Sequence, residues 1–229
     1  MSGAVEPLNC RAGRHVSLIL RDIWYRYPRS DRPLLQGVEL EVPTGASVAV
    51  MAPSGVGKST LLSIAGLLIK PDRGTVQIDG KDVGPKDGKR LLGDRVSWVL
   101  QSVNLLPHRT VLDNTILPSR AHGSSLDSSR ATATMLLTQL GLSHRLTSLA
   151  RTLSGGEAQR AGVARALVTS PSVLIADEPT ANLDRDTAQE VATALLSAAQ
   201  NTSVLLATHD PMIAEMADTV VHLAPARGD

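Results

Sequence analysis

The sequence predicts an α/β fold with a mostly parallel sheet, an N-terminal antiparallel β subdomain and a helical insertion subdomain. Near the N-terminus apolar residues alternate with polar ones, which is typical of strands that bury one face. After Pro171, apolar runs alternate with amphipathic helical segments, as in serial β-α-β units. Between these regions lies a long stretch with little strand pattern.

Length and composition exclude several classes of protein. The 229 residues are enough for one large domain with a sizeable core. With 23 basic and 22 acidic residues the net charge is +1, so no overall field favours nucleic acid as a partner. The single cysteine, Cys10, excludes an intramolecular disulfide and fits a reducing compartment such as the cytosol. The apolar run at 61–69 is far shorter than the roughly 18 residues that span a bilayer.

The first elements are predicted from apolar alternation. Residues 1–15 have no apolar core of a signal peptide, and we expect a flexible tail there. Alternation at 16–27 and again at 35–51 predicts strands, separated by the loop PRSDRP. The stretch GKSTLLSIAGLL then changes to helical spacing and is stopped at Lys70 and Pro71. This order is strand, glycine loop, helix.

The middle of the chain changes from strands to helices. Residues 74–83 resemble a hairpin, and 95–100 form a further strand. Helical runs follow at about 127–140 and 155–169. We therefore expect a helical subdomain at about 102–160.

The last quarter alternates strictly between strands and helices. The expected order is strand, helix, strand, helix, strand, at residues 172–178, 184–200, 202–210, 211–217 and 219–223.

These elements define the expected domain organisation. One domain covers 16–223, with a core built from 16–101 and 161–223. The helical subdomain interrupts this core, and residues 224–229 form a C-terminal tail.

The stretch APSGVGKST at 52–60 follows a predicted strand and precedes a predicted helix. In a P-loop the backbone N–H groups cradle phosphates, the lysine reaches the β and γ oxygens, and the hydroxyl residue holds Mg²⁺. The strict motif has glycine at Ala52, a difference that the backbone tolerates if φ is negative there. The flanking strand and helix disfavour a glycine turn that binds nothing. The sequence therefore predicts a P-loop NTPase with a RecA-like core, and its nucleotide-binding residues are Ala52, Pro53, Ser54, Gly55, Val56, Gly57, Lys58, Ser59 and Thr60.

Two carboxylates end the apolar run SVLIADEP. Asp177 and Glu178 would lie at the carboxyl end of a buried parallel strand, where doubly wound sheets bind ligands. Adjacent side chains point in different directions. Asp177 can therefore support Mg²⁺ while Glu178 acts as general base toward a water. The alternative is a carboxylate pair that caps the next turn.

Polar residues also follow two other predicted strands. His209 ends LLATHD and would hold the γ-phosphate and the attacking water rather than a metal, because no further ligand lies at metal-binding spacing. Gln101 ends RVSWVL and could reach Mg²⁺ or water, while the following SVNLLPH senses a partner. For each residue alone, a purely structural role is the alternative.

The stretch LSGGE precedes a predicted helix. Its glycines permit close backbone approach, and the free N–H groups of a helix N-terminus favour an anion. The alternative is an ordinary helix cap at Ser154. Because the helix lies in the insertion, the site would face outward, toward nucleotide held by another copy. This site comprises Leu153, Ser154, Gly155, Gly156 and Glu157.

Together these motifs resemble the ATP-binding cassette (ABC) ATPases over about 17–223. Five elements agree in order: APSGVGKST, Gln101, LSGGEAQR, LIADEPTANLD and His209. Within that family, QSVNLLPHRTVLDN and DEPTANLD look most like the lipoprotein-releasing and macrolide-exporter ATPase group. Departures from the usual pattern are Ala52, Glu157 and Ala181.

The resemblance implies two chains that sandwich two ATP molecules, each between one P-loop and the partner's LSGGE. It implies that Tyr27 stacks on adenine, that Asp184 couples the two sites at the dimer seam, and that Mg²⁺ is held by Ser59, Gln101 and Asp177. The partners would be a second copy, giving a homodimer, and transmembrane permease subunits at the cytoplasmic face of the inner membrane.

Two other functions stay open. One is a cell-division-type ATPase that regulates a membrane protein mechanically without transport. The other is a soluble chromosome or repair ATPase, although such proteins usually carry a long coiled coil or metal module for which the insertion has no room.

Overall fold

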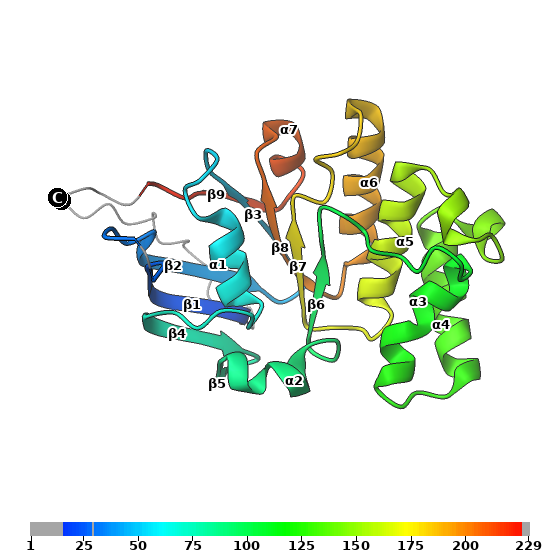
Figure 1. The fold of residues 1–229 in the computed structure, drawn as a ribbon, viewed down its shortest axis with the longest axis horizontal. Helices are drawn as coiled ribbons and strands as arrows, with labels where there is room; N and C mark the ends of the chain where they lie inside the picture. Colours follow the sequence, from blue (N-terminus) through cyan, green and yellow to red (C-terminus); the bar gives the residue numbers. More distant parts are fainter. Residues whose placement is uncertain (1–15, 29, 226–229) are drawn as a thin grey trace.

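The computed structural model describes residues 16–28 and 30–225, in which two sheets and a group of helices lie side by side (Figure 1). The tail expected at 1–15 lies outside the described residues, and so do residues 226–229 of the tail expected at 224–229. The α/β class predicted from the sequence is confirmed, with a parallel sheet at the centre and an antiparallel sheet beside it.

The antiparallel sheet has the strand order β2-β1-β4-β5. Its strands are β1 Val16–Tyr25, β2 Leu35–Pro43, β4 Arg73–Ile78 and β5 Lys81–Val83. Alternate residues of β1 are buried, among them Leu18 and Leu20, because one face packs on the core and the other meets solvent. The hairpin expected at 74–83 is formed by β4 and β5.

The central sheet has the order β6-β7-β8-β3-β9, and all its strands are parallel. Its strands are β3 Ser47–Met51, β6 Val96–Val99, β7 Val173–Asp177, β8 Ser203–Thr208 and β9 Thr219–His222. The prediction of a single strand at 35–51 is wrong, because this stretch forms two strands, β2 and β3, which lie in different sheets. A turn at Thr44 and Gly45, where φ is 68° at Gly45, redirects the chain from β2 into β3.

Helices cover both faces of the central sheet. The longer ones are α1 Lys58–Ala65, α3 Val111–Ala121, α4 Leu126–Gln139, α5 Gly155–Leu167 and α6 Arg185–Ala198, and the short ones are α2 Gly88–Leu91 and α7 Pro211–Ala214. Alternate residues of β8 join different cores. Leu205 packs with α1 and the antiparallel sheet, whereas Leu206 packs with the helical side. The central sheet is thus held between two hydrophobic cores, one on each face.

The helical region holds one more helix than the sequence indicated. Helix α3 was not predicted because it contains Pro118, and proline usually ends a helix. Helix α5 runs past residue 160, where the insertion was expected to end, so it belongs both to the insertion and to the packing against the sheet. Among the helices formed by residues 16–28 and 30–225, none combines the length and apolar character that crossing a bilayer requires.

Candidate nucleotide site

The carboxyl ends of β3, β7 and β8 meet at one edge of the central sheet. Gly57, with φ of 110°, ends the glycine loop and lets α1 begin at Lys58. This left-handed backbone suits glycine because a β-carbon would be strained there. Ala52 is not among the described residues with positive φ, so the condition for tolerating alanine at this position is met. A cavity of about 370 Å³ opens here, lined by Tyr27, Leu34, Pro53, Ser54, Gly55, Gly57, Lys58, Ser59, Thr60 and Glu178.

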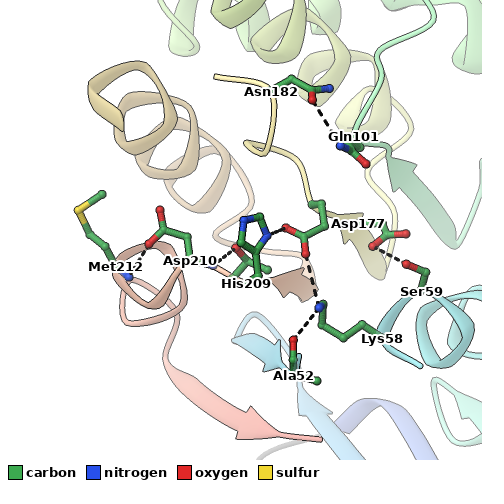
Figure 2. A network of polar contacts seen from close by, with 11 residues as sticks. Ala52, Lys58, Ser59, Gln101, Asp177, Asn182, His209, Asp210 and Met212 are labelled. Carbon is green, nitrogen blue, oxygen red and sulfur yellow. Dashed lines mark hydrogen bonds and ion pairs between the residues drawn. The ribbon is translucent and has the colours of Figure 1, made fainter. Parts of the chain in front are cut away.

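Lys58, Glu178 and His209 form a polar network at this edge of the sheet, and Lys58 and Glu178 also line the cavity. Figure 2 shows this network, with Lys58 and His209 labelled. The Lys58 Nζ donates to the Ala52 carbonyl at 2.7 Å and lies 3.7 Å from Glu178 Oε1. The His209 Nδ1 lies 2.8 Å from Glu178 Oε2. Lys58 and Glu178 are only 9% and 17% exposed, so their charges are poorly screened by solvent. The edge of the sheet therefore brings a lysine ammonium and a histidine imidazole into contact with the same glutamate carboxylate.

The backbone of Glu178 is itself unusual. Its φ is 47°, in the left-handed region that side-chain-bearing residues rarely adopt. The Glu178 N–H donates to the Ala207 carbonyl at 2.9 Å, which anchors this conformation to β8. Strained residues of this kind gather at functional sites, so the observation supports a role for Glu178.

Asp177 and Ser59 meet beside this network. The Ser59 Oγ donates to Asp177 Oδ1 at 3.3 Å. Burial raises the pKa of the Asp177 carboxyl, and the Ser59 hydrogen bond acts in the opposite direction. Together they offer a hydroxyl and a carboxylate, oxygen ligands of the type that Mg²⁺ prefers. Within the described part of the chain, no three His, Cys, Asp or Glu side chains come together as a complete metal site.

Tyr27 lies at the outer side of the cavity and is 47% exposed. Its hydroxyl lies 3.0 Å from Thr60 Oγ1 in α1, and its ring meets Tyr25 edge-on with centroids 5.2 Å apart. The exposed ring therefore has a fixed position beside the glycine loop. Trp24 does not line the cavity, and its Nε1 donates to Asp22 Oδ1 at 2.7 Å.

Gln101 and Asp184 lie outside the residues that line the cavity. The Gln101 Nε2 donates to Asn182 Oδ1 at 3.4 Å, a partner that the sequence analysis did not identify (Figure 2). Asp184 is the N-cap of α6 and accepts from the Thr187 N–H at 3.1 Å. This backbone hydrogen bond lowers the pKa of Asp184.

The LSGGE turn lies apart from the cavity, and none of its residues lines it. The Ser154 Oγ accepts from the Glu157 N–H at 3.2 Å, and the Glu157 Oε2 accepts from the Ser154 N–H at 2.9 Å. Ser154 is thus a helix cap in this chain, the structural alternative considered above. A β-carbon on Gly156 would lie 2.5 Å from Thr187 Cγ2, so close packing of α5 against α6 requires glycine there. Ser154 and Gly155 are exposed.

Two structural residues near the site escaped the sequence analysis. Asn114 is fully buried and bonds the backbone at Leu106 and Thr110, and Arg145 forms an ion pair with Glu157. The S-x-x-E spacing of the capping box was readable in the sequence. No local pattern marks Asn114 or Arg145.

A glycine loop between a strand and a helix, with a lysine and two carboxylates at the carboxyl edge of a parallel sheet, defines a P-loop nucleoside triphosphatase. The family model for the ABC transporter matches residues 35–181, more than half of the chain. The chain belongs to this family, as an ATP-binding and ATP-hydrolysing subunit.

Curated relatives match over most of the chain. The lipoprotein-releasing system ATP-binding protein LolD of Granulibacter bethesdensis is 45% identical, covering 90% of this chain and 93% of that protein. The macrolide export ATP-binding/permease protein MacB of Syntrophobacter fumaroxidans is 40% identical, covering 87% of this chain and 29% of that protein. Among solved structures, the chain is similar to the ATP-binding cassette MJ0796, solved as a dimer in a post-hydrolysis state bound to ADP and Pi. The two are 30% identical with a TM-score of 0.77, and the match covers 93% of this chain and all of that one.

Proposed function

We propose that two copies of this chain pair on ATP, hydrolyse it, and so drive a separate transmembrane permease of the lipoprotein, macrolide or peptide export type. The observation that carries this proposal is the contrast between the two phosphate-binding elements. The cavity around Lys58 is well formed, while the exposed turn at Ser154 lies outside it. A second chain would bring the two elements together over one nucleotide.

The described side chains suggest how hydrolysis proceeds. The backbone of residues 52–60 and the Lys58 ammonium hold the phosphates, with the ammonium offsetting negative charge. Glu178 accepts a proton from the water that attacks the γ-phosphate in line. His209, already 2.8 Å from Glu178, orients this carboxylate and contacts the γ-phosphate. From the partner chain, Ser154 and the amides of Gly155 and Gly156 close the site over the phosphate. Leu153 and Glu157 support that turn, and Asp184 couples the two sites.

The oxygen ligands beside the cavity fit Mg²⁺. Ser59 and Asp177 would hold the ion with the help of Gln101, and the remaining ligands would come from phosphates and water, as is usual for this cation. When bound, Mg²⁺ neutralises charge on the phosphates. The Gln101 Nε2 donates to Asn182 Oδ1, and it is the other amide atom, Oε1, that would ligate Mg²⁺.

Tyr27 provides the proposed base-stacking surface. Its ring is exposed, and its hydroxyl is fixed to Thr60, so the ring presents a face next to the phosphate loop. Stacking of bases on aromatic rings contributes about 1–3 kcal/mol in other systems.

The segment that follows Gln101 is the proposed contact with the permease. Leu100 and Leu106 are each 47% exposed and present apolar surface at both ends of residues 102–105. A permease at the cytoplasmic face of the inner membrane could cover these side chains, with this chain bound peripherally. Co-purification from membranes and identification of the bound integral protein would test this partner. ATP-dependent release of substrate from reconstituted vesicles would separate transport from purely mechanical regulation.

The Glu178→Gln substitution tests the proposed hydrolysis mechanism. We expect turnover to fall about 10²- to 10⁴-fold, the usual contribution of a general base, while ATP still binds. The variant should therefore accumulate as an ATP-dependent dimer on size exclusion. Lys58→Ala should instead weaken nucleotide binding itself. Hydrolysis at the wild-type rate by Glu178→Gln would contradict the assigned base, and an unchanged ATP affinity in Lys58→Ala would contradict the phosphate site.

A further inference from the structure

The Glu157 carboxylate accepts hydrogen bonds both from the LSGGE turn and from a second segment of the chain. Its Oε2 accepts from the Ser154 N–H at 2.9 Å, and its Oε1 accepts from the Arg145 Nε at 2.8 Å. His144 Nε2 lies 3.6 Å from the same Oε1. Charge-assisted hydrogen bonds of this length are among the stronger ones in proteins. The backbone bond from Ser154, followed by the Arg145 contacts, lowers the pKa of Glu157, so this side chain is ionised at neutral pH.

The segment that carries Arg145 is itself tied to the residues beyond Gln101. Backbone hydrogen bonds of 2.9–3.2 Å join residues 146–151 to residues 107–112. The N–H donors are Val111, Leu112, Ala150 and Arg151. The Ser148 N–H in turn donates to the Arg145 carbonyl at 2.9 Å. Residues 107–112 continue directly from the proposed permease contact. A continuous set of hydrogen bonds therefore leads from that contact, through Arg145 and Glu157, to the backbone of Ser154.

We propose that Arg145 is a positioning residue for ATP hydrolysis: through Glu157 it fixes the turn that presents Ser154 to the nucleotide of the partner chain. This inference rests on the proposed function of Ser154. Arg145 is not among the residues that line the nucleotide cavity, so it acts through Glu157 and not on its own chain's phosphates. The capping box alone holds the turn relative to α5. Arg145 adds a second point of attachment, relative to residues 107–112.

A purely structural role for Arg145 predicts a different result. The side chains of Arg145 and Glu157 are 36% and 12% exposed, and partly exposed ion pairs usually contribute little to folding. Loss of Arg145 should therefore change the melting temperature slightly. Dimer formation and turnover should respond much more, because both depend on the geometry of the Ser154 turn.

The test compares Arg145→Ala with Arg145→Lys and with Arg130→Ala. Arg130 is an exposed arginine of α4 in the same helical region, and it serves as the matched control. In the Glu178→Gln background, we expect Arg145→Ala to weaken the ATP-dependent dimer about tenfold, within the usual range for coupling residues. With Glu178 intact, its kcat should fall about tenfold, whereas ADP affinity measured on dilute single chains should not change. Arg145→Lys should recover part of the loss, and Arg130→Ala should match the parent.

A double-mutant cycle with Glu157→Gln tests whether Arg145 affects the dimer and turnover through Glu157. Glutamine keeps an oxygen for the Ser154 N–H but loses the charge that pairs with Arg145. If Arg145 acts through Glu157, the double variant should be no worse than the more affected single variant. Additive losses would overturn the inference, and so would a normal dimer and kcat in Arg145→Ala.

Ser154→Arg separates this inference from the proposed function on which it rests. If Ser154→Arg forms a normal ATP-dependent dimer and hydrolyses ATP normally, the proposed role of the turn is wrong. If Ser154→Arg is defective and Arg145→Ala is normal, only the positioning role is wrong. A lower melting temperature in Arg145→Ala, with turnover lost in proportion to unfolded protein, would also overturn it.

Discussion

Replacing Asn114 with alanine should lower the melting temperature of this chain by about 5–10 °C. Asn114 lies in the first turns of α3, and its side chain is fully buried. The Oδ1 accepts from the Leu106 N–H at 2.6 Å, and the Nδ2 donates to the carbonyls of Leu106 at 3.1 Å and Thr110 at 2.9 Å. One side chain thus fixes the irregular backbone between Gln101 and α3.

The magnitude follows from these contacts. Each hydrogen bond contributes about 1 kcal/mol net, so losing the three costs about 3 kcal/mol in the free energy of unfolding. Alanine is the better helix former, which offsets about 0.5 kcal/mol of that loss. The remaining 2.5 kcal/mol or so is a large share of the 5–15 kcal/mol typical of folded domains, and a domain of this size loses about 2–4 °C per kcal/mol.

Differential scanning calorimetry at fixed pH and without nucleotide measures the effect. Asn201→Ala is the matched control, because Asn201 is exposed in the turn before β8, and its melting temperature should stay close to that of the parent. A melting temperature for Asn114→Ala within about 2 °C of the parent would refute the reasoning. It would mean that water replaces the side chain at these backbone groups without loss.

Two further predictions concern the nucleotide site. Burial raises the pKa of Asp177, so the folded chain binds this proton more tightly than the unfolded chain, and the ionised carboxylate lowers stability at every pH above the raised pKa. Asp177→Asn should therefore have a higher melting temperature than the parent at neutral pH, and this difference should shrink as the pH falls through that pKa. Hydrolysis by the variant should drop at least about tenfold. A difference in melting temperature that is equal at all pH values would contradict this reasoning. Tyr27→Ala should weaken ATP binding by about 1–3 kcal/mol, and Tyr27→Trp should restore it, which equilibrium titration can measure; equal binding by all three chains would exclude stacking.

The sequence alone was enough to predict the fold class and the meeting of several polar side chains at one edge of the sheet, for a physical reason. Parallel strands end at one edge, so polar residues that follow apolar runs, such as Glu178 and His209, had to lie together. The strand boundary inside 35–51 was missed because both halves are apolar and alternate, and only the turn at Gly45 separates them. Helix α3 was missed because of Pro118.

Contacts between residues distant in sequence could not be predicted in the same way. Gln101 and Asn182, or Arg145 and Glu157, are joined by tertiary packing that leaves no local spacing to recognise. The capping box at Ser154 is local, and its pattern was present. An anion site and a helix cap at Ser154 were considered as alternatives, although one serine can cap a helix and still face a ligand from a second chain.

The left-handed backbone at Glu178 means that folding and chemistry favour different residues at this position. A glycine would adopt φ of 47° without steric conflict, so the backbone by itself favours a residue that cannot take a proton, although glycine would also remove the carboxylate that pairs with Lys58. Glutamate instead places an acidic group on a backbone that β8 must hold in place. Engineering of this enzyme for heat resistance should therefore leave Glu178 untouched, because relieving its backbone strain with glycine would also remove the proposed general base.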